Sequence, residues 1–234
     1  MTNLAIIPAR GGSKRIPRKN IRPFQGQPII GHVIRTVREC SVFTEVMVST
    51  EDQEIAGIAR KFGASIPFMR SLAAAGDKAT TLDVLHEVVA AYRDAGREFD
   101  TLCCIYPTAV LTRPATLRSG WELLQKNADA ACVLGVVPFE HPAQRALVVR
   151  NGKLQMLQPE HAHTRTQDLE PTYHDAGQWY WLRTAALRDP AFRILGPKSM
   201  PVVLDALEAQ DIDTEQDWDL AEAKFQLLLR GRSR

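Results

Sequence analysis

Cationic side chains gather around two adjacent glycines near the start of the chain, in a pattern that suits phosphate binding. Gly11 and Gly12 allow the backbone to approach a ligand closely with its N–H groups free to donate. Within ten residues the chain carries five cations: Arg10, Lys14, Arg15, Arg18 and Lys19. The first 38 residues hold eight Lys or Arg and no Asp or Glu, whereas a merely solvated loop usually mixes its signs. We therefore predict a loop that binds a polyphosphate.

Carboxylates gather near the other end of the chain. Between Asp205 and Ala223 there are eight Asp or Glu and no Lys or Arg. Asp211 and Asp213 are two residues apart, so in an extended segment they point to the same side and suit one hard cation such as Mg²⁺. The alternative is that these acids only complement the dipole of a following helix. Because Mg²⁺ also binds phosphate oxygens, the two charge blocks together favour a nucleoside-triphosphate site.

Composition and missing motifs exclude several other classes of function. The sequence contains no Gly-x-x-x-x-Gly-Lys-Ser/Thr, His-Glu-x-x-His or Gly-x-Ser-x-Gly pattern, which argues against ordinary ATPases, zinc hydrolases and serine hydrolases. A net charge of +2 on 234 residues does not suggest nucleic acid or a membrane surface as a partner. Four cysteines without a Cys-x-x-Cys pair, and no apolar run long enough for a signal peptide or a membrane span, favour a reduced cytoplasmic protein.

The cationic loop follows a short apolar run, residues 4–7, of the kind that forms a buried parallel strand. In open α/β sheets, ligands bind beyond the carboxyl ends of the strands, so this order supports the phosphate prediction. Further apolar runs predict strands that alternate with amphipathic helices up to residue 137, which indicates a parallel sheet. The predicted strands are 45–49, 65–68, 101–105 and 131–137, and the predicted helices are 28–40, 53–62, 81–92 and 114–126.

The alternation stops after residue 137. Asn151-Gly152 between two short apolar runs predicts a hairpin over 146–157, followed by a polar stretch from Gln158 to Asp175. An aromatic strand over 178–182, another strand over 201–204 and a closing helix capped by Thr214 complete the chain. We therefore expect one α/β domain over residues 1–234, with a small inserted arm at about 140–175.

The long motif Ile7-Pro8-Ala9-Arg10-Gly11-Gly12-Ser13-Lys14-Arg15-Ile16-Pro17-Arg18-Lys19-Asn20 resembles the signature of the CMP-sialic acid synthetases, cytidylyltransferases that activate nonulosonic acids. Further matches extend the resemblance over essentially the whole chain: Ser49-Thr50-Glu51-Asp52, Arg70 through Thr80, Tyr106-Pro107-Thr108, Arg165-x-Gln167-Asp168-Leu169 and Asp211-Ile212-Asp213-Thr214. The resemblance implies a Rossmann-like, mostly parallel α/β sheet of the nucleotide-diphospho-sugar transferase type. It also implies a homodimer in which the arm reaches across to the partner.

Two departures from the neuraminic acid members bear on the sugar. This chain has Tyr106-Pro107-Thr108-Ala109 where those members generally have Gln-Pro-Thr-Ser, and Asp175-Ala176-Gly177-Gln178 where they have Asn-Gly-Ala. The second segment is similar to that of the pseudaminic acid cytidylyltransferases, which favours pseudaminate as the substrate. The alternatives are legionaminate or N-acetylneuraminate and, from another class, a non-catalytic nucleotide-binding protein of the same fold. The retained Asp211 and Asp213 argue against the non-catalytic alternative.

By position, the resemblance implies four groups of site residues. The CTP triphosphate and part of the nucleotide would contact Arg10, Gly11, Ser13, Lys14, Lys19 and Asn20. The cytosine and ribose would lie near Arg70, Ala79 and Thr80. The sugar acid would contact Tyr106, Arg165, Gln167, Asp175 and Gln178. Mg²⁺ would bind Asp211 and Asp213, which with Arg10, Lys14 and Lys19 would be the catalytic groups.

The residue types suit attack by the anomeric hydroxyl on the α-phosphorus of CTP, with pyrophosphate leaving. Fixed cations and a metal would stabilise the charge that builds on the phosphoryl oxygens. The Arg165 guanidinium suits the carboxylate of the sugar acid, and the alternative is a surface salt bridge. The group that accepts the hydroxyl proton stays open between a metal-bound water, Asp213 and His174.

Overall fold

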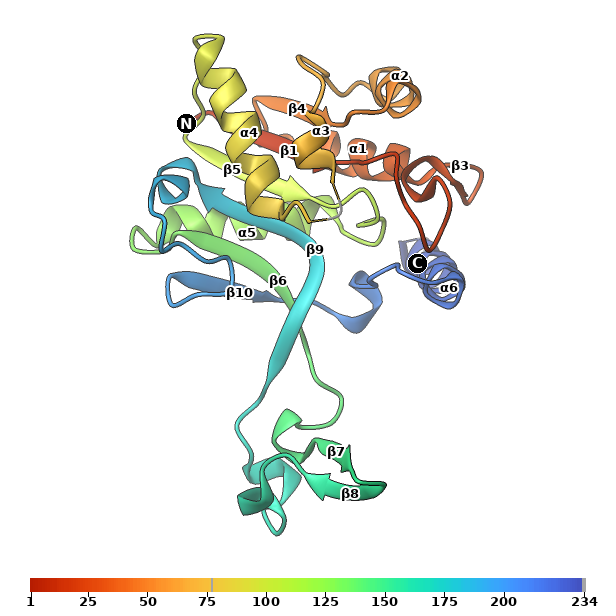
Figure 1. Cartoon of the computed structure of the whole chain (residues 1–234), viewed down its shortest axis with the longest axis vertical. Coiled ribbons are helices and arrows are strands. Elements are labelled where there is room, and N and C mark those ends of the chain that lie inside the picture. Colours follow the sequence, from red (N-terminus) through yellow and green to blue (C-terminus); the bar gives the residue numbers. More distant parts are fainter. Residues whose placement is uncertain (77, 233–234) are drawn as a thin grey trace.

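The computed structural model describes residues 1–76 and 78–232, and its main feature is a six-stranded sheet in the order β10-β6-β9-β5-β1-β4 (Figure 1). Five of the strands run parallel and β9 runs antiparallel to its neighbours β5 and β6. This arrangement confirms the predicted α/β fold with a mostly parallel sheet. The strands are β1 (Asn3–Pro8), β4 (Glu45–Ser49), β5 (Thr101–Ile105), β6 (Cys132–Pro138), β9 (Tyr173–Arg183) and β10 (Ser199–Val203).

Helices cover both faces of the sheet, which explains why its strands are continuously apolar. In β1, Leu4 and Ile6 pack with α4, whereas Ala5 and Ile7 pack with the helices on the opposite face. All four residues are fully buried. Figure 1 shows α4 and α3 crossing one face. The helices are α1 (Ile29–Cys40), α2 (Gln53–Lys61), α3 (Leu72–Ala75), α4 (Thr81–Asp94), α5 (Pro114–Lys126) and α6 (Glu215–Arg232).

Side-chain caps fix where two site-forming helices begin. Asp52 accepts hydrogen bonds from the Glu54 and Ile55 N–H groups at the start of α2. Thr80 and Asp83 form a reciprocal capping box at the start of α4, a pairing that satisfies two N–H groups which the helix itself cannot use. Both caps agree with the predicted helix starts.

The predicted strand over 65–68 is wrong. Only a single bridge joins Met47 to Ser65, beside β4 at the edge of the sheet. Pro67 has no N–H group, so it cannot donate to a continuing ladder. The segment crosses the edge and leads into Arg70, whose N–H donates to the Thr50 carbonyl.

The aromatic strand is longer than the predicted 178–182. It begins at Tyr173, where it pairs with Pro138 of β6, and ends at Arg183 beside Thr101 of β5. Trp179 and Trp181 are buried on the face that packs against α5. The first half of β9 leaves the body of the sheet together with the end of β6, and these paired strands form the base of the arm (Figure 1).

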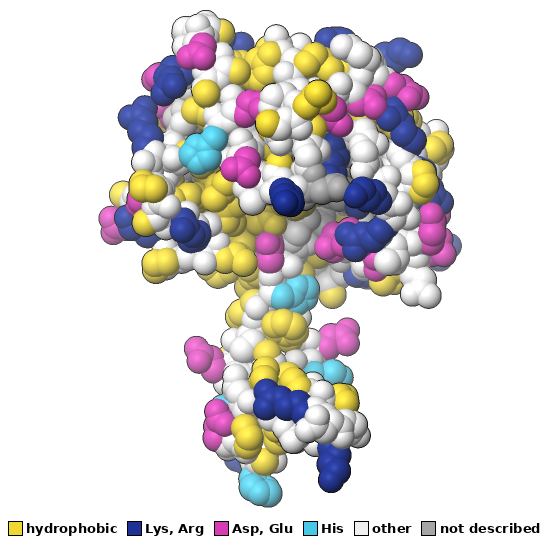
Figure 2. Space-filling model, viewed as in Figure 1, with side chains coloured by type: hydrophobic (Ala, Val, Ile, Leu, Met, Phe, Trp, Pro, Cys, Tyr) yellow, Lys and Arg dark blue, Asp and Glu magenta, His cyan; other side chains and the backbone are white. Residues whose placement is uncertain are grey.

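The arm carries the predicted hairpin, β7 (Leu147–Arg150) and β8 (Lys153–Met156), at its far end (Figure 1). Asn151 and Gly152 have positive φ values of 52° and 74°, as a tight two-residue turn requires. Register pairs Val149 with Leu154, so these apolar side chains lie on one face of the hairpin, and both are exposed. Figure 2 shows hydrophobic side chains on the projecting arm.

Short strands and 3-10 helices make up the remaining regular elements of the described chain. The short strands β2 (Pro23–Phe24) and β3 (Gln27–Pro28) pair with each other just before α1. Within residues 1–76 and 78–232, no helix has the length and apolar character needed to cross a membrane. The 3-10 helices of this part of the chain are η1 (Lys19–Ile21), η2 (Ala143–Arg145), η3 (Pro159–His161), η4 (Thr166–Asp168), η5 (Thr184–Arg188) and η6 (Ala206–Glu208).

Gly120 tests the packing of α5 on β9. A Cβ atom at Gly120 would lie 2.7 Å from Trp179 Cζ3, and the Trp179 ring is buried. We expect Gly120→Ala to lower the free energy of unfolding by about 1–3 kcal/mol through overpacking. The matched control is Gly57→Ala in α2, where no atom lies within 4 Å, and which we expect to raise it by about 0.5–1 kcal/mol. Urea unfolding measures both, and equal stabilisation by the two substitutions would contradict the packing.

Candidate functional site

Loops that follow the carboxyl ends of the parallel strands surround one pocket of about 510 Å³. The cationic loop follows β1, residues 106–108 follow β5, and the acidic segment around residue 211 lies beyond β10. The start of α4 and the segment before it close the remaining side. Predicted site residues that line the pocket are Arg10, Ser13, Lys14, Lys19, Asn20, Arg70, Ala79, Thr80, Tyr106, Asp211 and Asp213.

The two charge blocks meet directly at this pocket. Asp213 Oδ1 lies 2.6 Å from a guanidinium nitrogen of Arg15 and 3.4 Å from Lys19 Nζ. Lys19 Nζ also donates to the Ile212 carbonyl oxygen at 2.5 Å. Residues more than 190 positions apart in the chain therefore form one wall, with the cationic loop on one side and the acidic segment on the other.

Buried polar contacts hold the cationic loop in shape. The Asn20 side chain is buried and its Nδ2 donates to the Arg10 carbonyl oxygen at 2.9 Å. Arg18 adopts a left-handed conformation with φ of 54° and forms an ion pair with Asp52. The hydrogen bond from Arg18 lowers the pKa of the Asp52 carboxyl below its usual value. Because Asp52 also caps α2, one carboxylate fixes both the loop and the helix.

Gly11 does not line the pocket, although its role was predicted to be nucleotide binding. Its N–H donates to Glu51 Oε1 at 2.7 Å, so it is engaged with the segment after β4. The second carboxylate oxygen of Glu51 is buried without a hydrogen-bond partner in the described part of the chain. A glycine is needed here for close packing, because a Cβ atom would lie 2.5 Å from Asp52 Oδ2.

Arg70 enters the pocket from the edge of the sheet. It is only 6% exposed, and its Nε donates to Ser49 Oγ at 2.9 Å. Burial lowers the pKa of the guanidinium from its ordinary value. The contact with Ser49 at the end of β4 fixes the side chain beside Ala79 and Thr80, the other two residues predicted to lie near the cytosine and ribose.

Tyr106 joins β5 to the start of α4. Its hydroxyl lies 2.7 Å from Thr81 Oγ1, and its ring meets the Tyr180 ring edge-on with centroids 5.7 Å apart. Burial raises the pKa of Tyr106 to about 12, so the phenol keeps its proton at neutral pH and can donate a hydrogen bond.

Asp175 and Gln178, which were predicted to contact the sugar acid, do not line the pocket. Asp175 accepts hydrogen bonds from the Gly177 N–H at 2.9 Å and from the Tyr180 hydroxyl at 2.7 Å. Gln178 is buried and its Nε2 donates to the Gln210 carbonyl oxygen at 3.0 Å. Both side chains therefore tie β9 to its surroundings. Gly177 has a φ of 61°, and a Cβ atom added at this residue would lie 3.8 Å from Asp211 Cγ.

Arg165, Gln167 and His174 are not brought to the pocket of their own chain. Arg165 and Gln167 lie at η4 in the arm, where Arg165 Nε donates to Asp168 Oδ2 at 2.9 Å. His174 lies at the base of the arm, with its Nδ1 3.0 Å from the Asp175 carbonyl oxygen and its ring beside Phe139. None of the three lines the cavity.

Asp211 and Asp213 differ in their surroundings. The Asp213 carboxylate contacts Arg15 and Lys19, whereas no described residue forms a hydrogen bond or ion pair with the Asp211 carboxylate. Partial desolvation, and then the neighbouring charge of Asp213, raise the pKa of Asp211. No group of three or more His, Cys, Asp or Glu suited to a metal exists among residues 1–76 and 78–232. Two carboxylates facing a phosphate-type loop still fit a hard cation that takes its other ligands from phosphate and water.

Sequence reasoning missed three residues that shape the pocket. Arg15 was recognised as a cation of the loop, but its contact with Asp213 was not expected. Thr81 lies at the start of the helix predicted over 81–92, and its hydroxyl also forms a hydrogen bond with the Tyr106 hydroxyl. Tyr180 belongs to an aromatic strand with no polar motif, so nothing in the sequence marks its hydroxyl as the partner of Asp175.

A Gly-rich cationic loop at the end of a first parallel strand is typical of nucleotide-binding α/β proteins. Solved structures share this fold. A CMP:2-keto-3-deoxy-manno-octonic acid synthetase complexed with CTP aligns over 97% of this chain and 99% of its own, with a TM-score of 0.71 at 18% identity. A 4-diphosphocytidyl-2C-methyl-D-erythritol synthase from Anaerococcus prevotii covers 96% and 98%, with a TM-score of 0.65 at 13% identity.

The family model described as "Cytidylyltransferase" matches residues 4–187, and the chain belongs to this family of nucleotidyltransferases. It is 37% identical to a pseudaminic acid cytidylyltransferase of Campylobacter jejuni, over 97% of both chains. It is 34% identical to a CMP-N,N'-diacetyllegionaminic acid synthase of Legionella pneumophila, again over 97% of both. The resemblance noted from the sequence is thereby confirmed.

The two adjacent glycines of the loop give a matched test of its packing. We expect Gly11→Ala to displace Asp52 and Arg18, because its Cβ would lie 2.5 Å from Asp52 Oδ2. The loop should lose its shape, and the affinity for CTP should fall about tenfold. Gly12→Ala is the control, since no atom lies within 4 Å of its added Cβ. Calorimetric titration with CTP measures both, and equal affinities would show that the contact between Gly11 and Asp52 does not shape the loop.

Proposed function

We propose that this cytidylyltransferase transfers CMP from CTP to the anomeric hydroxyl of pseudaminic acid and releases pyrophosphate. The observation that carries the proposal is the pocket in which the cationic loop faces Asp211 and Asp213 beside Tyr106. The choice of sugar rests on the relatives named pseudaminic acid cytidylyltransferases and on Tyr106 and the Asp175–Gln178 segment, which depart from the neuraminic acid pattern.

In this proposal the cationic loop binds the triphosphate. Arg10, Lys14 and Lys19 would carry positive charge to the phosphate oxygens, and Ser13 would donate a hydrogen bond. Asn20 supports the loop by donating to the Arg10 carbonyl oxygen. On the opposite side of the pocket, Arg70, Ala79 and Thr80 would contact the cytosine and ribose. Fixed cations of this kind stabilise the charge that develops on a phosphoryl group without reorganising during the reaction.

Asp211 and Asp213 would hold Mg²⁺ in the proposed enzyme. The metal would neutralise phosphate charge and orient the nucleotide. The fit rests on their oxygen donors and on the absence of a described hydrogen-bond partner for the Asp211 carboxylate. Arg15 and Lys19 lie against Asp213, so the same carboxylate joins the metal position to the loop.

The sugar acid would bind between Tyr106 and the arm of a second copy of the chain. Arg165 and Gln167 lie in the arm and away from their own pocket, and a homodimer would bring them to the partner's pocket. The exposed apolar face of the hairpin, which includes Val149 and Leu154, supports such contact. Asp175 and Gln178 would then support the substrate wall from behind.

The proposed step forms a bond between the anomeric oxygen and the α-phosphorus, and breaks the bond from that phosphorus to the pyrophosphate oxygen. The hydroxyl proton passes to a base and the negative charge leaves with pyrophosphate. Asp213 contacts Arg15 and Lys19, and His174 lies outside the pocket wall, so neither is singled out as the base.

The four cysteines are buried and free, which supports a cytoplasmic location.

Sugar specificity is the direct test of the proposal. With CTP and Mg²⁺, we expect pyrophosphate release with pseudaminate at a higher kcat/KM than with legionaminate or N-acetylneuraminate. A coupled phosphate assay with the three sugars in parallel measures this. Turnover only with legionaminate, the sugar named for the Legionella relative, would keep the reaction and overturn the assigned sugar. CTP binding without turnover on any of the three would favour a non-catalytic nucleotide-binding protein.

The metal assignment has a separate test. We expect Asp211→Asn to lower kcat about 10²-fold or more. The reason is that the proposed Mg²⁺ would lose one of its carboxylate ligands and would then stabilise the phosphate charge less well. Asp219→Asn is the matched control, since Asp219 is an exposed acid of the same segment outside the pocket. Titration of activity with Mg²⁺ measures both variants. If Asp211→Asn turned over normally at the same Mg²⁺ concentration, these carboxylates would not be the metal ligands.

A further inference from the structure

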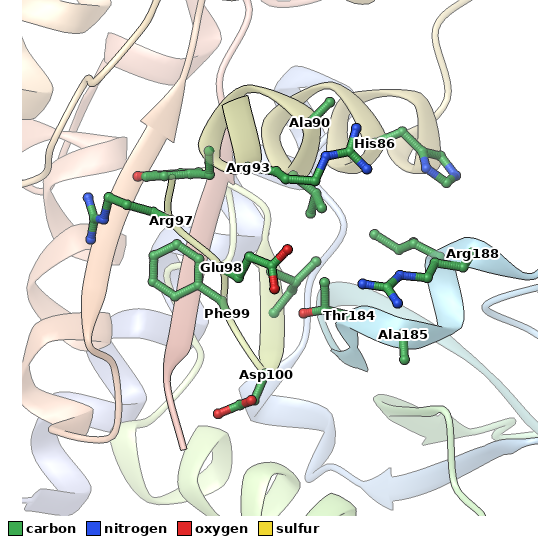
Figure 3. A pocket seen from close by; sticks show the side chains of 14 residues that line it. His86, Ala90, Arg93, Arg97, Glu98, Phe99, Asp100, Thr184, Ala185 and Arg188 are labelled. Atoms are coloured by element: carbon green, nitrogen blue, oxygen red, sulfur yellow. The ribbon is translucent and has the colours of Figure 1, made fainter. Parts of the chain in front are cut away.

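A second cavity, of about 540 Å³, lies at the opposite end of the sheet and shares no lining residue with the nucleotide pocket. It is formed by the second half of α4, the start of β5 and η5, and we call it the back pocket (Figure 3). Leu102 of β5 lines it, whereas Tyr106 beyond the other end of β5 lines the nucleotide pocket. At about 3.3 Å per residue, these two backbone positions are roughly 13 Å apart. The back pocket is therefore a separate feature.

The floor of the back pocket is apolar. Val89 and Ala90 of α4, together with Leu102 and Leu187, line it. Leu102 and Leu187 belong to the buried core cluster under α4, so the floor is continuous with the interior. A volume of this size and an apolar lining are typical of sites for small organic molecules.

Two guanidinium groups on the rim have no assigned partner. Within the described ranges, 1–76 and 78–232, the side chains of Arg93 of α4 and Arg188 of η5 form no hydrogen bond or ion pair. Figure 3 shows Arg188 reaching from η5 toward the space beneath α4. The two arginines come from different elements that border the same cavity.

Three other charged side chains lie on the rim: Arg97 and Asp100 have partners within the protein, and Glu98 adds a negative charge. Arg97 forms an ion pair with Glu45 and stacks on Phe99, and Asp100 accepts from the Thr2 N–H. Figure 3 shows both side chains pointing away from the cavity. The Glu98 carboxylate points inward, so it disfavours a highly charged polyphosphate. A ligand with one compact anionic group suits this balance of charges.

One buried polar atom also lacks a partner at this site. The Thr184 hydroxyl oxygen, where β9 passes into η5, is shielded from solvent and has no hydrogen-bond partner within the described residues. A buried hydroxyl without a partner costs free energy. Because this oxygen has almost no accessible surface, a ligand in the back pocket does not reach it in this structure.

We propose that the back pocket binds a small organic anion, a carboxylate or phosphate monoester that carries an apolar group. The anionic group lies between Arg93 and Arg188, whose forked guanidinium groups match carboxylate and phosphate oxygens. The apolar group lies on Val89, Ala90 and Leu187. This site goes beyond the cytidylyl transfer proposed above and does not depend on it.

The test uses phenyl phosphate and benzoate as probes, in calorimetric titrations of the full chain. Because the cationic loop also attracts phosphate, each titration is repeated with Lys14→Gln, which weakens the nucleotide pocket alone. We expect one site that survives Lys14→Gln and weakens tenfold or more in the double variant Arg93→Gln/Arg188→Gln, since charge-assisted pairs are lost. Loss in Lys14→Gln with retention in the double variant would assign the binding to the nucleotide pocket and overturn the proposal.

Two further arms test the apolar part and the source of the ligand. Val89→Trp fills the floor and leaves both arginines, so we expect it to abolish binding of either probe. Inorganic phosphate should bind tenfold or more weakly than phenyl phosphate, and equal affinity would overturn the requirement for an apolar group. Stronger binding of benzoate or of phenyl phosphate would identify the carboxylate or the phosphate monoester as the ligand type.

Thermal unfolding of each variant is the control for folding. The two arginines are exposed, so the double variant should unfold within about 2 °C of the wild type. It therefore keeps the proposal testable even if Val89→Trp fails to fold. Failure of both probes to bind the folded wild-type chain at millimolar concentration would overturn the proposal.

Discussion

The contact of Asp213 with Arg15 and Lys19 is the constraint on which the site depends. It joins the loop after the first strand to the segment before the last helix, which are the two strongly charged parts of the chain. Like charges within each block repel one another, and the ion pair of Arg22 with Glu215 also joins the two blocks. With the Asp213 contact, cations and carboxylates share one wall at the carboxyl ends of the parallel strands, where an α/β sheet leaves space for a ligand.

A second layer of contacts holds that wall from behind. Asp52 binds Arg18 and caps α2, and Asn20 holds the loop backbone. Beside Tyr106, Asp175 accepts a hydrogen bond from the Tyr180 hydroxyl, and the Tyr180 ring packs against the Tyr106 ring. In both places a buried polar group already has its hydrogen bonds before any ligand arrives. Such preorganisation lets a site stabilise developing charge without first rearranging.

The sheet separates two kinds of surface. At one end, the parallel strands open into a polar pocket with several fixed charges. At the other end, the back pocket combines an apolar floor with two arginines and a buried hydroxyl. The helix α4 borders both, with Thr81 at the first and Arg93 at the second. The arm extends away from this body (Figure 1), and in the proposed homodimer its residues Arg165 and Gln167 would reach the partner's pocket.

The sequence by itself determined the strand over residues 4–7, the cationic loop, the starts of the helices after Asp52 and Thr80, and the hairpin at Asn151-Gly152. Each of these depends on neighbouring residues and local periodicity. The resemblance to a family added further site positions, of which Arg70, Ala79, Thr80 and Tyr106 line the pocket, whereas Gly11, Arg165, Gln167, Asp175 and Gln178 do not. The tertiary structure alone decided that the Gly11 N–H donates to the Glu51 carboxylate and that Asp175 accepts a hydrogen bond from the Tyr180 hydroxyl. It also decided that β9 runs antiparallel to its neighbours in the sheet. The physical reason is that a polar side chain takes whichever partner the fold brings within hydrogen-bond distance, and those partners come from distant segments.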